Sequence, residues 1–313
     1  MEPAAVREVF DREVFWGAVV RGSLKDAMAY AGRFPEQAER LKKYASIFEE
    51  ERYLTYDVDG DLNAILLLYQ KYYRDAFYLE LDREEAGERL RKRLADLMQL
   101  PPDTDLDQLE ERAAEAFRRR SYHFLGGLTG GYRGPYIWTH EELRRYEVEL
   151  PDGVREYEVK LVDGFLSRSW AAYLSFGETG TSGWSNGDGP IHCVREAYDL
   201  ESEAFRVSLL KHEAQHAEDL ARYAGMSSED LEYRAKLVEL IYSDERNLLS
   251  RFIRQAGGAD NGHALAAERI VRDFETRLER PRSRLDSLPI GEIQAVSRTL
   301  FEESREEMER KYF

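Results

Sequence analysis

The chain has 313 residues, of which 42% are hydrophobic and 34% charged, and its formal net charge is -16. This length allows one large domain or two smaller ones with a sizeable core. The acidic balance disfavours sequence-independent binding of nucleic acid and docking on an anionic membrane, because both need a basic surface. The single cysteine, Cys193, excludes an intrachain disulfide framework and a cysteine-rich zinc site, so any metal must be bound by histidines and carboxylates.

The sequence shows no targeting or membrane segment. Its first residues lack a basic region followed by an apolar run, the pattern of a secretory signal. No stretch approaches the roughly 18 uninterrupted apolar residues that a spanning helix needs. We therefore expect a cytoplasmic protein that binds neither membrane nor nucleic acid.

The first 120 residues predict helices. Apolar residues recur at helical spacing in three runs, within residues 6–19, 41–48 and 62–73. Pro101-Pro102 ends a further helix, and another runs from about Asp107 to Arg120. We assign residues 1–124 to a helical region of unknown role.

From about residue 125 the pattern favours strands. Residues 146–150 and 157–161 alternate polar and apolar side chains around Pro151-Asp152-Gly153, which predicts a β-hairpin. Residues 170–176 predict a buried strand, and residues 190–196 a short one. The glycine-rich loop between these two strands, which includes Trp184 and Asp188, is either a flap over a cleft or a plain connection.

The remainder of the chain predicts helices to Phe313. The expected fold class is α+β, with a helical N-terminal part, a small antiparallel sheet, and a helical C-terminal half. Residues 125–313 would form the second domain.

One helix of this domain carries the sequence His212-Glu213-Ala214-Gln215-His216, an HExxH motif. No helix breaker occurs between Ser202 and Ala224. Residues four apart lie on one helical face, so both imidazoles can bind one zinc ion. Zinc lowers the pKa of a bound water toward about 7, and Glu213 can then act as the general base.

A catalytic zinc site needs a third protein ligand. A third histidine six residues after His216 is excluded, because Arg222 occupies that position. Gly225 ends the motif helix, and Ser227 or Ser228 caps the next one, which places Glu232 one turn in and small Ala235 on about the same face. Glu232 is therefore the predicted ligand. Three other carboxylates remain alternatives: Glu229, Glu239 and Asp244.

This combination resembles the zincin metallopeptidases, and within them the glutamate-ligated branch. The matched residues are His212, Glu213 and His216 on one helix and Glu232 with Ala235 on the next. The resemblance covers about residues 145–280 and implies a zinc-dependent hydrolase that cleaves peptide bonds in a peptide or protein substrate.

In that family, an edge strand before the motif helix binds extended substrate by strand addition. By position, the candidate edge strand here is Ile191–Arg195. We can assign the N-terminal 120 residues to no family, so the natural substrate stays open. The sequence does not give the oligomeric state either.

Members of the family usually supply a hydrogen-bond donor to the oxyanion of the reaction. His263 is the candidate, because it follows a glycine-rich loop at the start of a helix, although a plain surface position is the simpler interpretation. The alternative donors are Tyr223, Tyr233 and Tyr242.

A second hypothesis makes the protein a non-catalytic, partner-binding protein whose zinc is structural. Structural sites are closed by four protein ligands. A fourth ligand from His192 or His263 would favour this hypothesis. A helical scaffold without metal is the third possibility.

Overall fold

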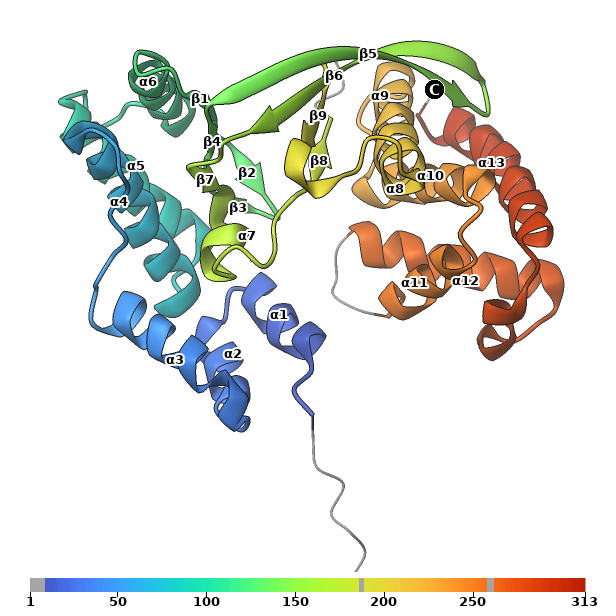
Figure 1. Ribbon diagram of the computed structural model, residues 1–313, viewed down its shortest axis with the longest axis horizontal. Coiled ribbons are helices and arrows are strands. Elements are labelled where there is room, and N and C mark those ends of the chain that lie inside the picture. The colour runs from blue at the N-terminus through green and yellow to red at the C-terminus, as the bar shows by residue number, and fades with distance from the viewer. Residues whose placement is uncertain (1–8, 186–188, 258–261, 313) are drawn as a thin grey trace, which may run out of the picture. The chain divides into compact units, whose positions relative to one another are not determined.

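The computed structural model describes residues 9–185, 189–257 and 262–312 (Figure 1). The chain divides into two compact units. The first consists of Met1–His140 and Gly164–Gly180, and the second of Glu141–Asp163 and Thr181–Phe313. Each combines helices with a small sheet, so the fold class is α+β, as the sequence predicts. The division differs from the expected boundary at residue 124, because residues 125–140 and 164–180 pack with the N-terminal helices.

Helices dominate the first unit, which confirms the prediction for the first 120 residues over the described part. Asp11 caps the first helix by accepting from the backbone N–H groups of Glu13 and Val14. The helices are α1 (Arg12–Val20), α2 (Leu24–Ala31), α3 (Ala38–Tyr44), α4 (Gly60–Tyr73), α5 (Arg83–Met98), α6 (Leu106–Arg118) and α7 (Ser169–Leu174).

The strands of the first unit are short and antiparallel. The strands β1 (His123–Leu125), β4 (Tyr136–Trp138) and β7 (Ser167–Arg168) form one sheet, and β2 (Leu128–Thr129) pairs with β3 (Tyr132–Arg133).

The predicted strand at residues 170–176 is wrong, because this segment forms α7. Trp170 and Leu174 both enter the core of the first unit, and their spacing of four places them on one helical face. Such short apolar runs fit a strand or a buried helix equally well by periodicity.

The second unit contains the predicted hairpin. Its strands β5 (His140–Leu150) and β6 (Gly153–Asp163) are longer than the alternating segments that predicted them. The short strand is also confirmed as β9 (Ile191–Val194), and β8 (Gly183–Trp184) completes the sheet in the order β5-β6-β9-β8. β9 runs parallel to β6 and antiparallel to β8, so the sheet is mixed.

The expectation that residues 191–195 form an edge strand is therefore wrong. The loop that precedes β9 returns as β8 and pairs with its outer side, with Trp184 opposite His192. A Cβ on Gly183 would lie 2.2 Å from Leu209 Cδ1, so only glycine lets β8 lie this close to the helical segment before the motif. Asp188, placed in the same loop, lies outside the described residues.

The C-terminal half is helical, as predicted. A π-helical segment, Arg206–Lys211, leads directly into the motif helix. The helices are α8 (Glu203–Phe205), α9 (His212–Arg222), α10 (Ser228–Tyr242), α11 (Asn247–Gln255), α12 (Gly262–Leu278) and α13 (Ile290–Tyr312). Within the described ranges, none of the helices has the length and apolar character needed to cross a bilayer.

The helix α10 packs against α9, α12 and α13 in the second unit, and it buries both apolar and charged side chains. Ser227 caps its N-terminus by accepting from the backbone N–H of Asp230. On one side, Arg234 forms an ion pair with Asp219 of α9, its Nε lying 2.9 Å from each carboxylate oxygen. Arg234 also donates to Ser304 Oγ of α13 at 2.8 Å, so one buried guanidinium connects three helices.

Removal of one partner of this ion pair should destabilise the second unit strongly. Arg234→Met leaves the Asp219 carboxylate buried and uncompensated, which typically costs about 3–5 kcal/mol. The double variant Asp219→Leu/Arg234→Met removes both charges and should recover most of that loss. Urea unfolding of the three proteins measures the effect. A single variant as stable as the wild type would show that the pair does not hold the helices together.

Candidate metal centre

The structure brings the three predicted ligands together. The Nε2 atom of His212 lies 3.6 Å from Glu232 Oε2, and the Nε2 atom of His216 lies 3.5 Å from Glu232 Oε1. One ligand atom from each of the three residues lies within 4.8 Å of the other two. The imidazole rings stand at 89° to one another with centroids 4.6 Å apart, so their Nε2 atoms converge on one carboxylate.

Local structure explains this convergence. His212 is the first residue of α9 and His216 lies one turn later, on the same face. Glu232 lies in the second turn of α10, whose start is fixed by the Ser227 cap. His212 and Glu232 are buried, and His216 is nearly so, with 14% of its side chain exposed.

A second carboxylate on α10 orients one of the histidines. The Nδ1–H of His212 donates to Glu239 Oε1 over 2.7 Å, and Glu239 is itself buried. Because this bond holds a proton on Nδ1, Nε2 is the nitrogen that faces Glu232 and would bind a metal ion. Carboxylates that hold metal-binding histidines in this way also raise their basicity. Glu239 was considered only as an alternative ligand, although its spacing of seven from Glu232 indicates the same helical face.

The electrostatics of the cluster favour ionised carboxylates beside cationic groups. Burial alone would raise the pKa of Glu232, but hydrogen bonds from His216 and His263 and the nearby charge of His212 hold that pKa well below its usual range. Burial lowers the pKa of His212, yet the bond to Glu239 and the charges of Glu239, Glu232 and Glu213 together outweigh it, and the net pKa is raised.

The cluster therefore fits a divalent cation. Two imidazole nitrogens and one carboxylate oxygen are one of the donor sets that catalytic zinc takes from proteins. A cation there would compensate the charge of the buried carboxylates. Within the described residues, the buried Nδ1 atom of His216 has no hydrogen-bond partner, so this ring is held through its Nε2 side.

Glu213, the predicted general base, is half-buried on α9 between the two histidines. Its charge helps to raise the pKa of His212. It also contributes to the raised pKa of Tyr198, whose main cause is burial, so Glu213 lies near both residues. Tyr198 donates to Ser182 Oγ at 3.0 Å. Sequence reasoning missed Tyr198, which lies in an irregular segment that carries no motif.

His263, the predicted oxyanion donor, contacts the cluster at its rim. It is the second residue of α12, 56% of its side chain is exposed, and its Nδ1 atom lies 2.6 Å from Glu232 Oε2. The structure thus places His263 against the third predicted ligand, outside the group of converging ligand atoms.

The three alternative tyrosines have other contacts. Tyr233 donates to Asp273 at 2.8 Å, and Tyr223 packs in a small cluster with Met226 and Met308. Tyr242 has the ammonium of Lys211 3.9 Å from its ring centroid. Of the contacts described for the four candidates, that of His263 is the one with a predicted ligand.

His192 and Cys193 are also outside the converging group. His192 stacks on Trp184 across the β8–β9 pair, with centroids 4.7 Å apart and rings 4° from parallel. Cys193 is buried in the core, where burial raises the pKa of its thiol to about 12. Such a thiol is a packing residue and not a nucleophile.

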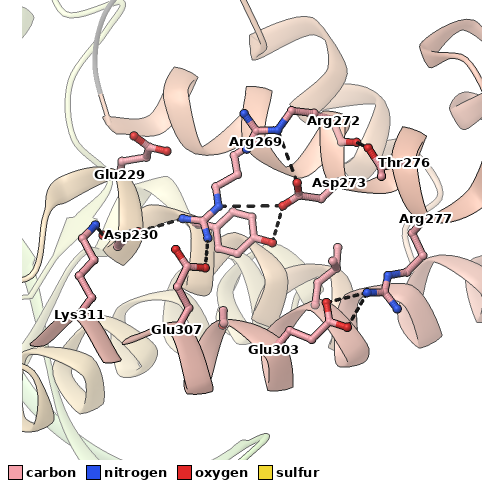
Figure 2. Close-up of a pocket in the computed structure, with 13 residues that line it drawn as sticks. Glu229, Asp230, Arg269, Arg272, Asp273, Thr276, Arg277, Glu303, Glu307 and Lys311 are labelled. Atoms are coloured by element: carbon pink, nitrogen blue, oxygen red, sulfur yellow. Dashed lines mark hydrogen bonds and ion pairs between the residues drawn. The ribbon is translucent and has the colours of Figure 1, made fainter. Parts of the chain in front are cut away.

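A large cavity of about 830 Å³ lies on a different side of α10, between α12 and α13 (Figure 2). Arg269 crosses it, donating to Asp230 at 2.9 Å and to Glu307 at 2.5 Å while its guanidinium lies 4.0 Å from the Tyr233 ring centroid. None of the three predicted ligands lines this cavity. Most of the charged side chains that line it form ion pairs with one another, which indicates an ionic network that connects helices.

Comparison of the chain with models of known families, with curated proteins and with solved structures finds no match. The case for a metal centre therefore depends on the geometry and chemistry of these residues.

Replacement of Glu239 should weaken zinc binding without removing a ligand. Glu239→Gln keeps the size of the side chain but loses the charge that orients His212, and such changes typically cost about 10–100-fold in metal affinity. Zinc affinity measured against a chromophoric chelator tests this expectation, with Glu229→Gln on the same helix as the control. Equal affinities for the two variants would remove Glu239 from the site.

Proposed function

We propose that this protein is a zinc-dependent hydrolase of the zincin type that cleaves amide bonds in a peptide or protein substrate. The observation that supports it is the convergence of the Nε2 atoms of His212 and His216 on the carboxylate of Glu232. These residues occupy the positions that the HExxH motif and the resemblance assign to metal ligands.

His212, His216 and Glu232 would hold the ion, and Glu239 would fix the orientation of His212. When bound, zinc would polarise the scissile carbonyl and make a water molecule acidic near neutral pH. Glu213 would accept the proton of the attacking water and pass it to the leaving nitrogen, which completes the hydrolysis. His263 would donate a hydrogen bond to the developing oxyanion.

The number of converging ligands separates this proposal from a structural zinc site. Among the residues that the structure describes, three metal-binding side chains converge, and neither His192 nor His263 joins them as a fourth. An incomplete protein shell leaves a position for water or substrate, whereas structural zinc is closed by four protein ligands. This observation favours the hydrolase over the structural alternative. We retain the cytoplasm as the proposed compartment.

Loss of a ligand and loss of the base should have different consequences. His212→Ala and His216→Ala should lose the roughly one zinc per chain expected of the wild type, because two protein ligands bind the ion poorly. Glu213→Gln should keep the zinc and lose hydrolysis of a peptide library. Elemental analysis and peptide turnover measure the two effects.

His140→Ala, on an exposed residue, is the matched control and should change neither measurement. Full zinc content in both histidine variants would place the site elsewhere. A Glu213→Gln protein as active as the wild type would exclude Glu213 from the reaction.

The contact of His263 with Glu232 permits a test of its role. If His263 donates to the oxyanion, His263→Ala should keep zinc affinity and substrate affinity, and lose turnover by about a hundredfold or more. Zinc titration and steady-state kinetics of one preparation separate the alternatives. Weakened zinc binding with otherwise normal turnover would instead assign His263 to positioning Glu232.

A further inference from the structure

Lys236 is a buried cation on the same side of α10 as the two carboxylates of the candidate metal centre. It lies four residues after Glu232 and three before Glu239, and this helical spacing puts the three side chains on one face. Only 5% of its surface is exposed. Lysine is seldom buried to this extent unless it is paired with a carboxylate.

Its direct contacts leave most of that charge without compensation. The ammonium donates to Gln255 Oε1 at 3.1 Å and lies 4.5 Å from the ring centroid of Phe252, both on α11. Neither contact is with an anion, and no carboxylate of the described residues forms a salt bridge with it. A buried ammonium with three donors and one neutral acceptor is costly, so its charge needs another explanation.

The carboxylates of the metal centre supply that explanation. Burial lowers the pKa of Lys236, the charges of Glu239 and Glu232 raise it, and Arg251 on α11 lowers it further, so that the net pKa lies below its usual value. Lys236 therefore interacts electrostatically with the two carboxylates that contact the histidines. The two carboxylates compensate the charge of Lys236 through space and without direct contact, because the buried site has a low dielectric constant.

We propose that Lys236 is a positioning residue that sets the charge of the metal centre, and with it the affinity for zinc. A divalent ion and one ammonium balance the three carboxylates of Glu213, Glu232 and Glu239. Without the ammonium the loaded site would carry a net negative charge. The lysine thus weakens zinc binding and keeps the ion a stronger Lewis acid, because fewer uncompensated anions surround it.

This inference rests on the zinc site of the proposed function, but not on hydrolysis. It leads to an unusual expectation, because removal of the buried charge of Lys236 should strengthen zinc binding. Lys236→Met keeps the length of the side chain and its packing against Phe252 while removing the charge. A unit charge one or two helical turns away, at an effective dielectric constant of about 20, should change zinc affinity by on the order of tenfold or more.

The experiment is a zinc titration of the full chain against a chromophoric chelator, with no substrate present. Lys236→Met should bind zinc about tenfold or more tightly than the wild type, and Lys236→Arg should restore wild-type affinity because it keeps the charge. Lys25→Met, which removes a lysine over the Tyr78 ring in the first unit, is the control and should change nothing. If Lys236→Met does not fold, Lys236→Gln takes its place with the same expected gain.

Unchanged or weaker zinc binding in the charge-removing variant would overturn the inference. So would a Lys236→Arg protein that binds as tightly as Lys236→Met, because packing and not charge would then be responsible. A wild-type protein that binds no zinc would instead refute the proposed function itself, so the two failures are distinguishable.

Discussion

The helix α10 places charged side chains in the interior of the second unit, and each of these charges has to be compensated. The candidate site depends on this constraint. Two carboxylates on one face of α10, Glu232 and Glu239, are buried against the histidines of α9. Buried ions are tolerated only when other charges or hydrogen bonds compensate them. A cation held between these residues would satisfy that requirement, and the same two helices would then act as one metal-binding element.

On other faces of α10, ion pairs between side chains of the protein compensate the buried charges. Arg234 compensates Asp219 and reaches α13, and Arg269 compensates Asp230 and Glu307 in the large cavity. These pairs fix how α9, α12 and α13 pack on α10. Because His263 is the second residue of α12, the contact of Arg269 with Asp230 also helps to keep that histidine beside Glu232.

The sequence predicted the cluster of candidate ligands because local geometry determines much of it. The i,i+4 spacing of the histidines and the cap at Ser227 are local features, and both hold in the structure. The orienting role of Glu239 depends on the rotamer that His212 adopts where α9 packs against α10. The burial of Lys236 depends on its contacts with α11. Such contacts between helices leave no sequence signal in one chain. For the same reason, the sequence did not show that β9 pairs with β8 and is not an edge strand. The wrong strand at residues 170–176 has another cause, because a short apolar run fits a strand and a buried helix equally well.

The most direct measurement of the central claim is a crystal structure of the zinc-treated protein with anomalous data at the zinc absorption edge. The expected result is one ion at about 2 Å from the Nε2 atoms of His212 and His216 and from one oxygen of Glu232, with the remaining position filled by a molecule other than the protein. An ion bound elsewhere, an empty cluster at saturating zinc, or a site closed by a fourth protein ligand would contradict the account.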